Sequence, residues 1–106
     1  MTNRPAFVIA GRGGIGLGEL VVAVNATQAA LDVALAREYA GECALHDAHQ
    51  AARTAQPEQL GQADAWCAAA GDKLHSAILE VKRASEQLLI AQTSLSQAIG
   101  SRRSSA

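Results

Sequence analysis

Apolar residues recur at seven-residue spacing through the second half of the chain. From Leu60 to Ile99, one series consists mainly of large apolar residues, and a second series, three positions further on, consists of alanines. Positions three and seven residues apart fall on one face of an α-helix, so the two series form neighbouring stripes. The pattern predicts a long helix, over about residues 57–100, that lies close against another helix. We call the stripes the large seam, Leu60, Cys67, Leu74, Val81, Leu88 and Leu95, and the small seam, Ala63, Ala70, Ala77, Ala84, Ala91 and Ala98.

The first half of the chain repeats this pattern with two lapses. A helix is predicted over about residues 17–52, followed by a break at residues 53–58. Pro57 suits a first helical position and Glu58 suits the positive end of the helix dipole. Because so short a break makes the two helices antiparallel neighbours, the sequence predicts a helical hairpin. The large seam of the first helix is Leu17, Val24, Leu31, Glu38, Leu45 and Ala52, and its small seam is Leu20, Thr27, Ala34, Gly41 and Ala48.

Folding the chain about residue 56 places like seams opposite each other. Leu31 then meets Val81, and Gly41 meets Ala70. Small residues face small residues at nearly every second layer, so the axes can approach toward the lower end of the usual ~8–10 Å. The fold class is therefore predicted to be all-α. We expect a flexible Gly-rich arm over residues 1–16, the hairpin over 17–100 and a disordered tail over 101–106.

Further apolar residues lie outside both seams. They come in pairs eleven residues apart, close to three helical turns, and cluster toward the open end of the hairpin. Self-association, or pairing with another helical-hairpin protein, would bury them in a four-helix bundle. We therefore predict a homodimer or a complex with such a partner. The expected interface residues are Val22, Val33, Ile78, Leu79, Leu89 and Ile90.

Composition and charge exclude several classes of function. The 106 residues are 49% hydrophobic and 3% aromatic with a net charge of −1, which indicates one small domain without a basic surface for nucleic acid or an anionic membrane. No stretch approaches the ~20 apolar residues of a membrane span, and residues 6–10 are too few for a signal peptide. The protein is expected to be cytoplasmic. The two cysteines, Cys43 and Cys67, are expected to be reduced thiols.

Motifs for catalysis or cofactor binding are weak. Gly11, Gly13 and Gly16 match the dinucleotide-binding spacing, but nothing downstream supplies the parallel sheet that this motif requires. No nucleophile motif, phosphate loop or paired-carboxylate cleft is present, and two packed helices offer no concave pocket of the usual size. We therefore expect no cofactor and no enzymatic activity.

The alternative hypothesis is a metal-binding bundle of ferritin-like type. Asp72 and His75 copy, with a shorter acid, the Glu-x-x-His spacing of di-iron bundles. A solvated polar face is the favoured interpretation, because a metal site needs three or four convergent ligands. Glu38 lies in the large seam, where it either reaches Lys73 or Arg37 or marks a local opening of the hairpin. The candidate ligands are Glu38, Glu42, Cys43, His46, His49, Cys67, Asp72 and His75.

A chain of about a hundred residues with two long Ala-rich helices, a central turn and a tryptophan near it resembles the WXG-type proteins of type VII secretion. The resemblance covers Leu17 to Gly100 and is architectural. The family carries Trp-x-Gly in the turn, whereas Trp66-Cys67-Ala68 lies in the predicted second helix. The family's Tyr-x-x-x-acid export signal has no counterpart, since Cys43 is the fourth residue after Tyr39. The resemblance implies a paired four-helix bundle and an adaptor role without catalysis. Both departures count against export, so export without a cleavable signal peptide is only the alternative to a cytoplasmic location.

Overall fold

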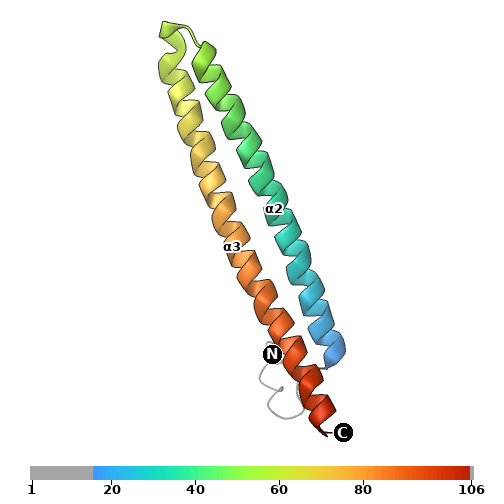
Figure 1. The fold of residues 1–106 in the computed structure, drawn as a ribbon. Coiled ribbons are helices and arrows are strands. Elements are labelled where there is room, and N and C mark those ends of the chain that lie inside the picture. Colours follow the sequence, from blue (N-terminus) through green and yellow to red (C-terminus); the bar gives the residue numbers. More distant parts are fainter. Residues whose placement is uncertain (1–15, 106) are drawn as a thin grey trace, which may run out of the picture.

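The protein folds as a helical hairpin in the computed structural model, which describes residues 16–105. Helix α2 spans Leu17–Thr54, a short 3₁₀ helix η1 spans Pro57–Gln59, and helix α3 spans Leu60–Ser105. The two long helices run side by side in opposite directions, with η1 at one end and the start of α2 and the end of α3 at the other (Figure 1). The predicted all-α hairpin is confirmed. Apart from Gly16, the predicted N-terminal arm lies outside the described residues.

Local hydrogen bonds and backbone preferences set the ends of α2 and the start of η1. The Gly16 N–H donates to Glu19 Oε1 at 3.2 Å, and this acid lies in the first turn, where the helix dipole favours negative charge. Gln56 is extended, with φ −71° and ψ 157°, because the residue before a proline is disfavoured in the helical region. Its N–H donates to Gln59 Oε1 at 3.2 Å. The chain therefore breaks at the predicted place, just before Pro57.

Helix α3 is longer than the sequence predicted. It continues through Ser105, so the tail predicted as disordered over residues 101–106 is helical as far as that residue. Arg102 and Arg103 lie in the last turn. Cations interact favourably with the negative end of the helix dipole, and arginine is a good helix former, which explains the extension.

The core is confined to the two seams. The buried residues are Ala34, Ala48, Ala63, Ala70, Ala77 and Leu88, and each belongs to a predicted seam. Every other seam residue is at least partly shielded, with the exception of Leu60 beside the turn, which is 44% exposed. The seam prediction is therefore confirmed as a description of which faces meet.

The helices approach closely at Gly41, although its neighbour differs from the predicted one. A Cβ added to Gly41 would lie 3.3 Å from the Cα of Leu74 and 3.3 Å from its Cδ1. The sequence paired Gly41 with Ala70, one turn away. Cα–Cβ bonds tilt toward the N-terminus of their own helix, which in an antiparallel pair is toward higher residue numbers on the neighbouring helix. This tilt has the direction of the displacement, but one turn is about 5.4 Å along the axis, more than one Cα–Cβ bond spans, so the helices also differ in register from the predicted pairing.

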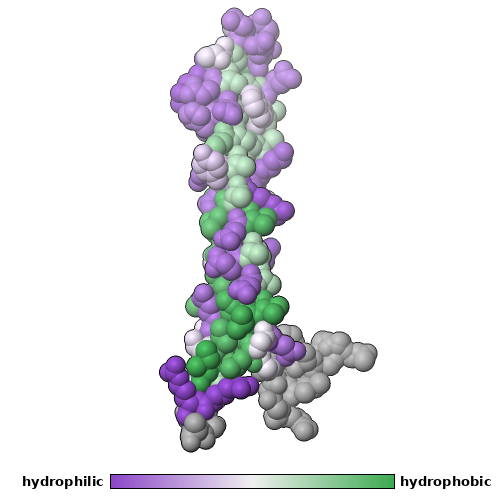
Figure 2. Space-filling view, turned by 90° about the vertical axis from the view of Figure 1, so that its right-hand side faces the viewer, coloured by the Kyte–Doolittle hydropathy of each residue, from purple (hydrophilic) through white to green (hydrophobic). Residues whose placement is uncertain are grey.

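Within residues 16–105 the hairpin is a single layer of two helices, so these residues cover each helix on one side only. None of the large side chains described is fully buried. Figure 2 shows apolar side chains gathered in the half of the molecule near the open end, while the turn end carries mainly hydrophilic side chains. The open half is therefore the place where burial is least complete.

Candidate interaction surfaces

The six predicted interface residues are all exposed in the single chain. Their exposed fractions run from 44% at Ile78 and Leu79 to 65% at Val22. The structure also exposes large apolar residues that the sequence analysis did not select. Three of these are Val21, Leu35 and Ile99, and each follows a large-seam residue by four positions, a spacing that could have identified them.

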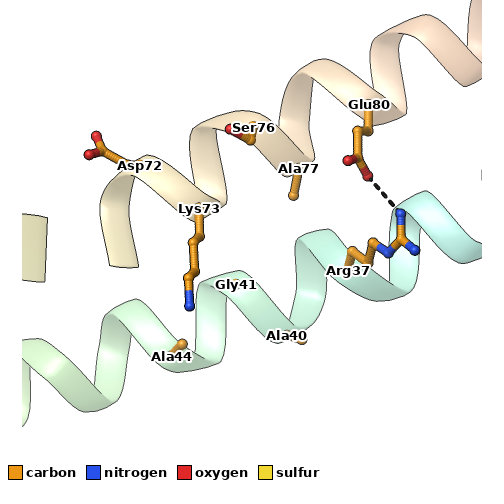
Figure 3. A pocket seen from close by; sticks show the side chains of 9 residues that line it. All are labelled: Arg37, Ala40, Gly41, Ala44, Asp72, Lys73, Ser76, Ala77 and Glu80. Atoms are coloured by element: carbon orange, nitrogen blue, oxygen red, sulfur yellow. Dashed lines mark hydrogen bonds and ion pairs between the residues drawn. The ribbon is translucent and has the colours of Figure 1, made fainter. Parts of the chain in front are cut away.

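Three open grooves lie along one side of the hairpin, which we call the groove side. Almost every lining residue is a small-seam residue, or lies one position before or three positions after one. These positions share one side of each helix, so all three grooves lie on the same side of the hairpin. Two smaller grooves of about 350 and 330 Å³ include Trp66 near the turn and Thr27 in the open half. The largest, of about 470 Å³, is lined by Arg37, Ala40, Gly41, Ala44, Asp72, Lys73, Ser76, Ala77 and Glu80 (Figure 3).

An ion pair crosses the largest groove. Arg37 Nη1 lies 3.2 Å from Glu80 Oε1, joining α2 to α3 (Figure 3). The sequence left two alternatives for Glu38, an ion pair with Lys73 or Arg37 or a local opening of the hairpin. Glu38 makes no hydrogen bond or ion pair with the residues that the structure describes. Glu38 is instead partly shielded on the large seam, while Arg37 faces the groove. The ion pair is solvent-exposed, so its contribution to stability is small.

We call the opposite side of the hairpin the large-seam side. In the open half, this side is more apolar than the groove side. Residues that follow a large-seam position by one or four lie on this side, away from the grooves. They include Val21, Leu35, Ile78, Leu89 and Ile99, which are all exposed. These five residues form an apolar strip that both helices share. Exposed uncharged polar residues interrupt the strip, namely Asn25, Gln28, Ser85, Gln92 and Ser96.

The predicted interface residues consequently do not form one patch. Ile78 and Leu89 lie on the large-seam side. Val33 and Ile90 each precede a small-seam residue and lie on the groove side, whereas the remaining two point toward the outer edges of the hairpin. The eleven-residue spacing identified a common face within each helix, but it did not relate the faces of the two helices to each other.

The candidate metal ligands do not converge. Among residues 16–105, no group of three or more His, Cys, Asp or Glu side chains is placed to hold a metal ion. Cys43, His46, His49 and His75 are exposed, and the structure contains both cysteines as free thiols. Cys43 lies one turn after Tyr39, and its hydrogen bond raises the pKa of that phenol.

Helix α2 is more apolar than the sequence analysis allowed. An 18-residue stretch within it has a mean hydropathy of 1.4, so by length and composition alone the helix could cross a membrane. Such a helix is weak evidence, because core helices of soluble proteins and signal sequences have the same properties. In this structure its large seam packs on α3, and Asp32 interrupts its apolar half. An aspartate at the centre of a membrane-spanning helix costs about 2.5 to 3.5 kcal/mol.

Comparison of the chain with protein-family models, curated proteins and solved structures finds no match.

Proposed function

We propose that this chain is a non-catalytic interaction protein that pairs with itself or with another helical hairpin to form a four-helix bundle. The observation that carries the proposal is the imbalance between its core and its surface. Of the six buried residues, five are alanines, whereas twelve large hydrophobic residues among those described are exposed. Alanine buries little apolar area, and exposed apolar patches of this kind are typical of protein–protein contacts. A second helix pair would supply the missing cover.

The proposal gives the protein an adaptor role. Its resemblance to WXG-type proteins would associate it with type VII secretion, and that association rests on architecture alone. The metal-binding alternative has no convergent set of ligands to support it within residues 16–105. The largest groove carries Ser76 near Lys73 and Glu80, but among the described residues Ser76 makes no hydrogen bond to a base that would activate it.

The proposal is tested by removing the exposed apolar residues of α3 as a set. A variant with Ile78, Leu79, Leu89 and Ile90 all changed to Glu should lose both self-association and capture of a helical-hairpin partner, with helix content retained by circular dichroism. Its control changes the exposed Gln50, Gln62, Gln87 and Gln97 to Glu, which adds the same charge without removing apolar surface. Light scattering gives the mass of each protein. The proposal would be overturned if the wild-type chain did not self-associate and also bound no partner that the variant fails to bind.

A further inference from the structure

We infer that the large-seam side binds a second copy of this chain, about a two-fold axis parallel to the long axis of the hairpin. The inference rests on the proposed function and specifies its partner and symmetry. It follows from the distribution of charge around the apolar strip rather than from the strip alone.

The large-seam side carries two charged residues in its open half. Of the positions that follow a large-seam residue by one or four between Gly18 and Leu35, and between Ile78 and Ile99, only Asp32 and Lys82 are charged. Both are exposed, and both follow a large-seam residue directly. Asp32 lies on the outer part of α2 and Lys82 on the outer part of α3, so opposite charges flank the apolar strip.

These two charges lie at the same level along the hairpin. Ala30 and Arg83 line one groove together, and Arg37 reaches Glu80 a little further toward the turn. Asp32 and Lys82 fall between these two cross-connections. Within the hairpin the two side chains are separated by the width of the strip, and Asp32 accepts a hydrogen bond at 3.0 Å only from Gln28 of its own helix among the described residues.

With a two-fold axis parallel to the helices, α2 of one copy packs face to face against α3 of the other. The axis fixes the register, because each residue remains at its own level. Asp32 then faces Lys82 of the second copy, and the symmetry repeats this ion pair on the other edge. Leu35 and Ile78 of the two copies form an apolar layer between the pairs and the turn. All neighbouring helices in this bundle are antiparallel.

The other symmetric way of stacking two hairpins does not use these charges. A two-fold axis perpendicular to the helices, lying in the interface, opposes α2 to α2 and α3 to α3. Asp32 and Lys82 then lie on different edges and never meet. Charge complementarity therefore selects the parallel axis, since it both steers association and fixes register.

Charge reversal tests the symmetry directly. Asp32→Lys and Lys82→Asp each place like charges at both edges, and each variant alone should self-associate about tenfold more weakly than wild type at low salt. An equimolar mixture of the two should recover association, because both ion pairs are complementary in the mixed dimer. The double variant D32K/K82D should also associate like wild type. High salt should reduce all these differences.

Two adjacent residues provide a matched test of which side of the hairpin forms the dimer interface. Leu89 is 62% exposed on the large-seam side, and Ile90 is 58% exposed on the groove side. Leu89→Glu should dissociate the dimer, whereas Ile90→Glu should leave its mass unchanged in light scattering. Circular dichroism confirms that both variants remain helical.

Three outcomes would overturn the inference. A wild-type dimer whose two charge-reversed variants associate no better when mixed would have another symmetry. A wild-type monomer that binds a different helical hairpin would overturn the second copy while leaving the proposed function intact. A wild-type chain that forms no dimer in buffer but floats with phosphatidylcholine vesicles would place a bilayer on the apolar strip. The proposed function itself fails only when the wild-type chain binds neither a second copy nor another helical hairpin.

Discussion

At the scale of single residues, the close contact between the helices depends on a glycine, which has no Cβ. Gly41 allows its helix to approach the backbone of Leu74, whereas Gly71 has no heavy atom within 4 Å of an added Cβ. Both lie inside helices, where replacing glycine by alanine normally stabilises by roughly 0.5 to 1 kcal/mol.

We therefore expect opposite effects from the same substitution at these two glycines. Gly71→Ala should raise the free energy of unfolding by about 0.5 to 1 kcal/mol through reduced backbone entropy. Gly41→Ala should lower it, because the new Cβ meets backbone at 3.3 Å and the helices must separate. Urea unfolding measures both. Equal stabilisation by the two changes would mean that the helices are not in close contact at Gly41.

The lapses in the first helix's seams show what residue identity alone can predict. Thr27 functions as a small-seam residue because its Oγ1 donates within its own helix, to the carbonyl oxygens of Ala23 at 2.9 Å and Val24 at 3.0 Å. Among the described residues, Glu38 makes no such hydrogen bond within its own helix. Of the two alternatives for Glu38, the ion pair does not form, because Arg37 lies on the groove side and meets Glu80 there instead.

At the scale of the helices, seven-residue periodicity predicted most of the fold. The start at Leu17, the break before Pro57 and the buried seams follow from the spacing of apolar residues and one proline. The C-terminal end did not follow, because the serines and arginines after Gly100 neither favour burial nor stop a helix. The interface residues were predicted as exposed apolar positions, but their arrangement required the relative rotation of two helices.

The alanine seam predicts a specific sensitivity to added volume. Ala77 is 6% exposed where the helices meet, so Ala77→Leu should lower the free energy of unfolding by about 1 to 3 kcal/mol through overpacking. Ala69→Leu is the control, because Ala69 is exposed on the same helix and the change in helix propensity is the same. Thermal melts of both variants decide. If Ala69→Leu destabilised the protein and Ala77→Leu did not, the small seam would not be the face on which the helices meet.

At the scale of the whole molecule, one hairpin has little means of stabilising itself. Its core consists of alanines and one leucine, and none of the large side chains described is fully buried. The apolar side chains that could stabilise it most are on the surface of the open half. Folding and association should therefore be coupled, since each exposed Leu or Ile that becomes fully covered contributes roughly 1.5 to 3 kcal/mol.

This coupling predicts that the melting temperature depends on protein concentration. Because a bound second copy stabilises only the folded chain, the melting temperature of wild type should rise as the protein is concentrated. The variant with Ile78, Leu79, Leu89 and Ile90 changed to Glu should melt lower and show no such rise, while the four-glutamine control should follow wild type. Scanning calorimetry over a wide range of concentrations measures this. A concentration-independent wild-type melt would show that α2 and α3 suffice for stability, and that the exposed apolar residues are not part of a self-assembled core.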